Sequence, residues 1–122
     1  MKTLVLGASD NPERYAWKAA ELLHSKGHEV IAVGIKKAFT AAQIQIQTEL
    51  KAWEQIDTIT LYLSKENQKP YYDFILNTIQ PHRVIFNPGT ENPELIQLLK
   101  TKVPQCRIEI ACTLVMLQIG NY

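Results

Sequence analysis

The sequence has few glycines and almost no net charge, and both shortages exclude classes of protein. Of its five glycines, only Gly7 stands in the turn after the first apolar segment, so the dinucleotide fingerprint G-x-G-x-x-G is missing. Thirteen basic and twelve acidic residues leave a formal net charge of +1. No global field therefore exists that would attract nucleic acid or an anionic membrane, and any recognition of an anion must be local.

Cysteine, long apolar runs and recognisable catalytic sets are also scarce. The two cysteines, Cys106 and Cys112, form neither a CxxC pair nor a disulfide framework. No apolar run approaches the roughly 20 residues that span a bilayer, and no signal peptide is apparent, so we expect a cytoplasmic protein. No Ser-His-Asp set, HExxH motif or P-loop lysine is found, and the three histidines lack metal-ligand spacing. We expect neither enzyme activity nor a metal site.

The pattern that is present is an alternation of short apolar runs with segments of helical period. A chain of 122 residues is long enough for one domain with its own core. Strands that alternate with helices imply βαβ units with right-handed crossovers. We predict one domain over residues 1–122, a three-layer, Rossmann-like, doubly wound α/β sheet that is mostly parallel and has five or six strands. The predicted strands are 2–6, 28–34, 43–47, 57–64, 83–89 and 106–110, and the predicted helices are 15–26, 50–55, 68–80, 92–102 and 111–120.

In such a sheet the ligand lies beyond the carboxyl ends of the strands. The rule selects the loop after the first strand, GASDNPER, which offers a flexible glycine and a hydroxyl group before a helix. A helix N-terminus attracts anions, and Arg14 stands beside it. Ser9 and Asn11 could alternatively serve only to cap this helix. The rule also selects loops 34–37, 64–67 and 87–92.

The turn after the second strand separates the candidate ligands. A cofactor with a free ribose 2′-hydroxyl usually meets an acidic residue about 20 residues beyond the glycine turn. Here Lys36 and Lys37 occupy this place without a carboxylate. Two lysines suit a phosphorylated ribose, which occurs as the 2′-phosphate of NADP and the 3′-phosphate of coenzyme A. The residues favour a phosphorylated adenosine ligand other than NAD, with solvated surface lysines as the alternative.

The stretches GASDNPERY, FNPGTENPEL and EIACTLVML, in this order, resemble the small stand-alone CoA-binding domain proteins. These are relatives of the CoA-binding domain in the succinyl-CoA synthetase alpha subunit, and the resemblance covers nearly the whole chain. It implies a Rossmann fold that binds coenzyme A, with the ADP part over the first loop and the turn after the second strand. That turn matches loosely, because many members have Pro-Val-Asn-Pro-Lys where this chain has Ala-Val-Gly-Ile-Lys-Lys. The positions that the resemblance assigns to CoA binding are Gly7, Ala8, Ser9, Arg14, Lys36, Lys37, Gly89 and Asn92.

The resemblance also bears on activity. The synthetase relatives use a phosphorylated histidine that lies in a further domain, which this sequence does not include. We therefore expect a module that binds CoA or acyl-CoA as a carrier, a sensor or one half of a complex, with a protein partner or a second copy possible. The alternatives are an NADP-dependent oxidoreductase subunit and a Rossmann-like interaction domain whose pocket has decayed.

Overall fold

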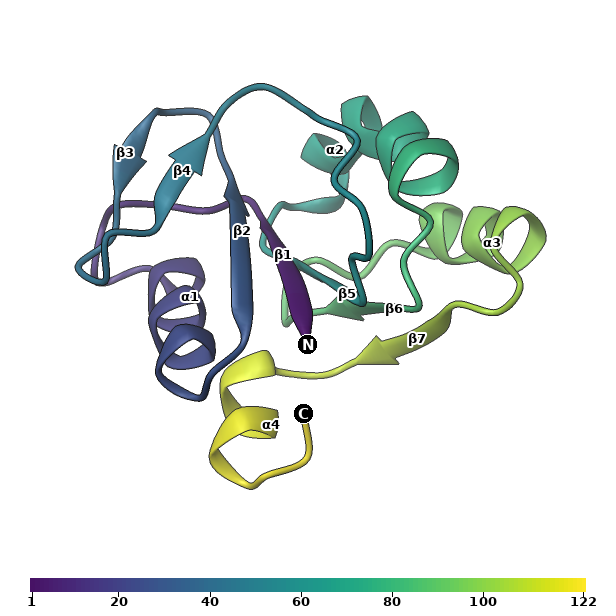
Figure 1. Ribbon diagram of the computed structural model, residues 1–122. Helices are drawn as coiled ribbons and strands as arrows, with labels where there is room; N and C mark the ends of the chain where they lie inside the picture. Colours follow the sequence, from purple (N-terminus) through teal and green to yellow (C-terminus); the bar gives the residue numbers. More distant parts are fainter.

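The computed structural model describes all 122 residues and contains one sheet of seven strands in the order β3-β4-β2-β1-β5-β6-β7 (Figure 1). The strands are β1 (Lys2–Leu6), β2 (Glu29–Val33), β3 (Ala38–Phe39), β4 (Gln45–Gln47), β5 (Thr58–Leu61), β6 (Arg83–Phe86) and β7 (Arg107–Ile110). The helices are α1 (Tyr15–Ser25), α2 (Lys65–Gln68), the 3₁₀-helix η1 (Lys69–Tyr71), the π-helix η2 (Phe74–Ile79), α3 (Pro93–Lys102) and α4 (Thr113–Gln118).

The strand β1 lies at the centre of the sheet and pairs in parallel with β2 on one side and β5 on the other. Every pairing is parallel except that of β3 with β4. The predicted class, a mostly parallel and Rossmann-like α/β sheet, is confirmed. The predicted number of five or six strands is wrong, because the two-residue strand β3 is too short to leave a periodic signal and turns back onto β4.

Helices cover both faces of the sheet, as the apolar pattern of the strands requires. On one face, Ala16, Ala20 and Leu23 of α1 pack with Val5 and with Leu117 of α4. On the other face, residues of α3 and η2 pack against β1, β5 and β6 in a larger cluster of fifteen buried side chains. Figure 1 shows α1 and α4 together on one side and η2 and α3 on the other. The small side chains of α1 bring this helix close to the sheet.

Two predicted helices differ from the structure. Residues 50–55 form no helix, and Gln55 there has a left-handed φ of 61°. The predicted helix 68–80 is instead built from α2, η1 and η2, and it begins at Lys65. Pro70 lies in the 3₁₀-helix η1, which follows α2 directly, and the later turns widen into the π-helix.

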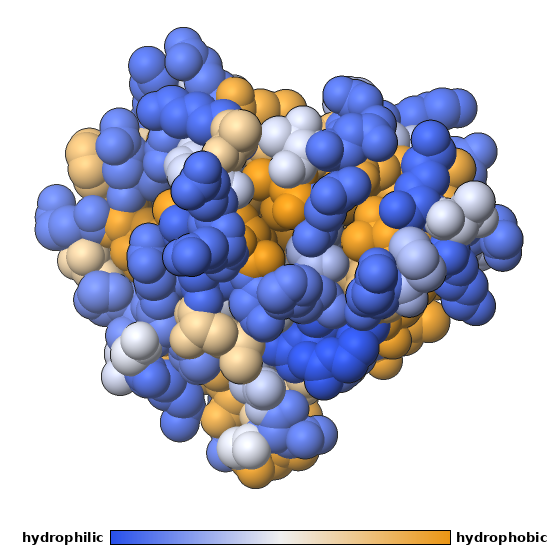
Figure 2. Space-filling view, turned by 45° about the vertical axis from the view of Figure 1, so that its right-hand side comes forward, coloured by the Kyte–Doolittle hydropathy of each residue, from blue (hydrophilic) through white to orange (hydrophobic).

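Polar side chains dominate the surface in the view of Figure 2, and apolar atoms reach it at the lower tip, where Figure 1 places α4. No helix in the structure is both long and apolar enough to cross a membrane.

A candidate ligand cleft at the carboxyl ends of the strands

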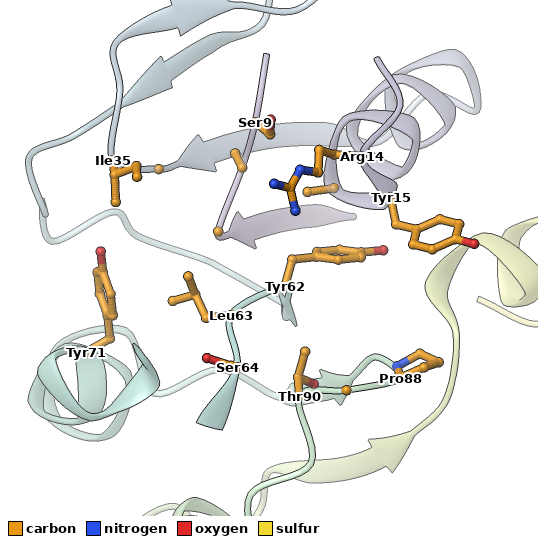
Figure 3. Close-up of a pocket in the computed structure, with 15 residues that line it drawn as sticks. Ser9, Arg14, Tyr15, Ile35, Tyr62, Leu63, Ser64, Tyr71, Pro88 and Thr90 are labelled. Atoms are coloured by element: carbon orange, nitrogen blue, oxygen red, sulfur yellow. The ribbon is translucent and has the colours of Figure 1, made fainter. Parts of the chain in front are cut away.

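A cleft with a volume of about 410 Å³ opens where the carboxyl ends of β1, β2, β5 and β6 meet (Figure 3). The cleft lies at the carboxyl end of β1, between the ends of its neighbours β2 and β5. Doubly wound sheets bind their ligands at this place. Its walls come from the loops after these four strands, from the start of α1 and from η1. The residues that line it are Gly7, Ala8, Ser9, Arg14, Tyr15, Ala16, Gly34, Ile35, Tyr62, Leu63, Ser64, Tyr71, Pro88, Gly89 and Thr90.

Two glycines allow the loop after β1 to lie against its neighbours. Gly7 has a φ of +97°, and a Cβ added there would lie 2.9 Å from the backbone carbon of Tyr62. A Cβ at Gly34 would lie only 2.5 Å from the carbonyl oxygen of Ala8. The N–H groups of Gly7 and Ala8 both donate to the carbonyl oxygen of Val33, each at 2.9 Å. The loop is therefore held between the ends of β2 and β5 by close backbone approach.

The N-terminus of α1 faces the cleft without a side-chain cap. Arg14 occupies the N-cap position with extended backbone angles, and its side chain makes no capping hydrogen bond. The first intrahelical bond runs from the N–H of Lys18 to the carbonyl oxygen of Arg14, so the N–H groups of residues 15–17 have no acceptor in the chain. Figure 3 shows the Arg14 guanidinium directed into the cleft. Free donors and a cation together make this a site for an anion.

The polar side chains of the first loop shape the loop itself. The hydroxyl of Ser9 accepts a hydrogen bond from the N–H of Asn11 at 3.1 Å, and the side-chain oxygen of Asn11 accepts one from the N–H of Glu13 at 3.0 Å. Both bonds fall before the first helical residue. Neither Ser9 nor Asn11 caps α1, and the alternative that these residues serve only as helix caps is wrong.

Tyr62 lines the cleft with its ring, and its hydroxyl group lies beside Thr60 and Thr113, which are not cleft residues. Its oxygen is buried and has no hydrogen-bond partner. The nearby hydroxyls of Thr60 and Thr113 bond to each other, at 2.8 Å. Burial raises the pKa of Tyr62 to about 12, so the phenol stays neutral and keeps its proton for donation. The hydroxyl is therefore an internal group, and the ring is the part of Tyr62 that faces the cleft.

A buried amide fixes the floor of this region. Asn87, at the end of β6, donates to the Thr60 hydroxyl at 2.7 Å and to the Leu61 carbonyl oxygen at 2.8 Å. Its side-chain oxygen accepts from the N–H of Thr113 at 2.9 Å. One side chain therefore joins β5, β6 and the start of α4, and it positions the turn at residues 88–90 that lines the cleft.

Five of the eight predicted binding residues line the cleft, namely Gly7, Ala8, Ser9, Arg14 and Gly89. Asn92 does not. Its side chain is 3% exposed, caps α3 by accepting from the N–H of Leu95 at 3.2 Å, and donates to Gln68 and to the Tyr72 hydroxyl at 2.9 and 2.8 Å. The side-chain oxygen and nitrogen of Asn92 are already hydrogen-bonded within the protein, so the role of Asn92 in the structure is to hold α3 in place.

The two predicted lysines also stand outside the cleft lining, although they directly follow Gly34 and Ile35, which belong to it. The ammonium group of Lys36 lies 3.2 Å from the carboxylate of Asp10, and this pair links the turn after β2 to the loop after β1. Lys37 is exposed and has no carboxylate within ion-pair distance. The two lysines are therefore not equivalent.

The sequence does not predict Tyr62 and Tyr71 as cleft residues. The predicted strand 57–64 runs three residues too far, because β5 ends at Leu61, and Tyr62 therefore belongs to the strand-end loop. The sequence gives no signal for this end, because the apolar alternation of Ile59 and Leu61 continues to Leu63. Tyr71 comes from η1, whose 3₁₀ geometry turns it toward the cleft, and no helical periodicity predicts that.

Known proteins show the same sequence and fold features. The family model of the CoA binding domain matches residues 1–118. A crystal structure described only as that of an uncharacterized protein is 47% identical, with a TM-score of 0.92, and the match covers 99% of this chain and 97% of that one. The structure of cell-free ID.343 from Thermus thermophilus is 18% identical, with a TM-score of 0.81 over 99% of this chain and 90% of that one.

A hypothetical protein from Pyrococcus horikoshii OT3 is likewise 18% identical, with a TM-score of 0.74 over 97% of this chain and 82% of that one. At this identity the two thermophile structures support the fold alone. No functionally curated protein matches the sequence. Because the family model spans nearly all of the sequence, the chain belongs to the CoA-binding domain family.

Proposed function

We propose that this chain binds coenzyme A or an acyl-CoA in the cleft and works as a binding module without catalytic activity of its own. The observation that carries the proposal is the uncapped start of α1. The N–H groups of residues 15–17 are free and Arg14 is directed into the cleft. In a member of the CoA-binding domain family, this arrangement fits the diphosphate of the ligand.

Other parts of the cleft suit the rest of the ligand. Ile35, Leu63 and Tyr71 supply apolar surface for the adenine ring or the pantetheine arm. We assign the 3′-phosphate to the basic turn after β2, with Lys37 as the free cation and Lys36 shared with Asp10.

The chemistry of the lining supports binding rather than catalysis. The fifteen lining residues include no Asp, Glu, His or Cys. Its titratable side chains are Arg14 and three tyrosines, and the Tyr62 phenol, with a pKa of about 12, is a poor base near neutral pH. A carrier or sensor of CoA, or one half of a complex, needs only the binding groups that are present.

Side-by-side calorimetric titration with CoA, 3′-dephospho-CoA, NADP and NAD tests the proposal. CoA is expected to bind more tightly than its dephospho form, and NAD is expected to bind poorly. Neutralising both lysines (Lys36→Gln with Lys37→Gln) should weaken CoA by about 1–3 kcal/mol. The pair Lys100→Gln and Lys102→Gln on α3 makes the same change of charge away from the cleft and is the matched control.

Three results would contradict parts of this proposal. Equal affinity for CoA and dephospho-CoA would remove the lysines from the site. Tighter binding of NADP than of CoA would favour the oxidoreductase subunit. Binding of none of the four would leave an interaction domain with a decayed pocket.

A further inference from the structure

The strand β7 forms one edge of the sheet, and the hydrogen-bonding side that it turns outward is open. The N–H groups of Arg107 and of Ala111, the residue after β7, donate to the carbonyl oxygens of His82 and Phe86 on the β6 side. Because successive residues of a strand turn to opposite sides, Ile108 and Ile110 direct their N–H and C=O groups away from the sheet. No strand lies there. Such an edge is a template for another strand.

The usual protections of an exposed edge are weak in this strand. The sequence RIEI contains no proline, and its residues pair with β6 in unbroken register. Ile110 is 63% exposed, and Val115 and Ile119 in the following segment are 49% and 68% exposed. Figure 2 shows apolar atoms at the tip of the molecule formed by α4. An open edge next to exposed apolar side chains is typical of an interaction surface.

Charge identifies the strand that fits this edge. Arg107 and Glu109 lie two residues apart and therefore on one face of the sheet. If a second β7 runs antiparallel across a two-fold axis at Ile108, Arg107 of each copy stands directly opposite Glu109 of the other. Ile108 then exchanges two hydrogen bonds with its own counterpart, and the N–H of Ile110 reaches the carbonyl oxygen of Cys106 in each direction. Opposite charges at facing positions stabilise such pairs.

The neighbouring register is disfavoured. An axis at Glu109 makes the same number of backbone bonds, but it places the two Glu109 carboxylates opposite each other. Glu109 is also held in position, because its carboxylate lies 4.0 Å from Nη1 of Arg83, whose side chain is 2% exposed. We propose that this chain forms a two-fold homodimer through antiparallel pairing of β7, in the register that sets Arg107 against Glu109.

The proposed dimer is independent of the ligand site. None of the residues of β7 lines the cleft, which is built at the ends of β1, β2, β5 and β6. Two copies paired at β7 would join their sheets into one continuous sheet and leave both clefts open. Loss of the dimer should therefore not alter CoA binding, and the two proposals fail separately.

Sedimentation equilibrium and light scattering across a concentration series test the proposal. The wild-type chain should reach twice its mass of 13.9 kDa. Ile110→Pro removes an N–H that the fold does not use, and it should abolish the dimer while circular dichroism stays unchanged. Arg107→Glu should weaken the dimer about tenfold or more through repulsion at two sites. Lys102→Glu on α3 is the charge control and should leave the dimer intact.

The register has its own test. Arg107→Glu places only acidic groups at the proposed contact, and Glu109→Lys places only basic ones. Each variant alone should dimerise at least tenfold more weakly than the wild type, and an equimolar mixture should form a heterodimer. Circular dichroism must first show that Glu109→Lys folds, because this change removes the carboxylate beside the buried Arg83. A wild-type chain that stays monomeric, or a dimer that survives Ile110→Pro, would overturn the proposal. A mixture that fails to pair while Ile110→Pro dissociates the wild type would overturn the register.

Discussion

Replacing Gly34 by alanine would test the contact on which the cleft is built. A Cβ at this position would lie 2.5 Å from the carbonyl oxygen of Ala8 and 3.0 Å from a methyl carbon of Ile46. Gly34 is not among the glycines with positive φ, so the substitution adds bulk without backbone strain. Few positions in the chain separate these two effects so cleanly.

The expected size of the effect follows from what must move. The obstructing atom belongs to the backbone, and the N–H of the same residue, Ala8, is bonded to Val33 at 2.9 Å. The loop after β1 must retreat by about 1 Å before an ordinary contact of about 3.5 Å is restored. Overpacking of this kind costs about 1–3 kcal/mol of the free energy of unfolding. Because the same loop carries Ser9 and leads to Arg14, we expect CoA affinity to fall by about tenfold, or ~1.4 kcal/mol.

Urea denaturation and calorimetry with CoA measure the two effects, and Gly27→Ala supplies the control. Gly27 follows α1, has a φ of +87° and has nothing within 4 Å of an added Cβ. That variant should lose stability through strain and keep its affinity for CoA. If Gly34→Ala retains the wild-type unfolding midpoint and the wild-type affinity, the approach of the two loops does not build the site.

Three further predictions concern single side chains. Asn92→Ala should lower the free energy of unfolding by about 2 kcal/mol, because it removes the α3 cap, a buried hydrogen bond to Gln68 and a partly buried one to Tyr72. CoA affinity should stay nearly unchanged, and a large loss of affinity without loss of stability would return Asn92 to the ligand site. Asp10→Asn should change stability by less than about 1 kcal/mol, because its pair with Lys36 is exposed. It should raise CoA affinity at low salt, and an unchanged titration would show that Lys36 does not contact ligand. Burial lowers the pKa of His28, so the unfolded chain takes up a proton at a higher pH than the folded chain does. The free energy of unfolding should therefore fall as pH drops below about 6.5. Urea midpoints at about pH 7.5 and 5.5 measure this loss, and His28→Gln should make it smaller.

The elements that the sequence predicts well are those with a strong period and a clear end. The helix at Tyr15 has small and apolar residues at helical spacing and ends before Gly27, and the structure places α1 over nearly the predicted range. The segment 68–80 is helical as predicted, but it is not a single α-helix, and the reason is physical. Its residues Phe74, Ile75 and Leu76 are consecutive and all buried, and a π-helix accommodates three neighbouring apolar side chains that an α-helical stripe would not.

Cleft residues can be predicted from the sequence where their place at the end of a strand decides that they line the cleft. They are harder to predict where a side chain can bond either to a ligand or to another protein group. The strand-end rule selects the loops around Gly7 and Gly89, which line the cleft. Asn92 matches a family motif, but Asn-Pro-Glu is equally the signature of a helix start, and the cap is what the structure shows. The pair of Asp10 with Lys36 joins loops distant in sequence, so no local pattern reveals it.

The central position of β1 has a consequence for the order in which the chain is made. Its residues Leu4, Val5 and Leu6 leave the ribosome before the strand that completes their pairing, β5, which ends only at Leu61. At about 5–20 residues per second, the interval lasts roughly 3–11 s. Throughout it, one edge of β1 lacks its partner strand, and the core on the α3 side is still untranslated. The nascent chain therefore exposes an apolar, aggregation-prone strand for seconds. A ribosome-associated chaperone would act on it during this interval.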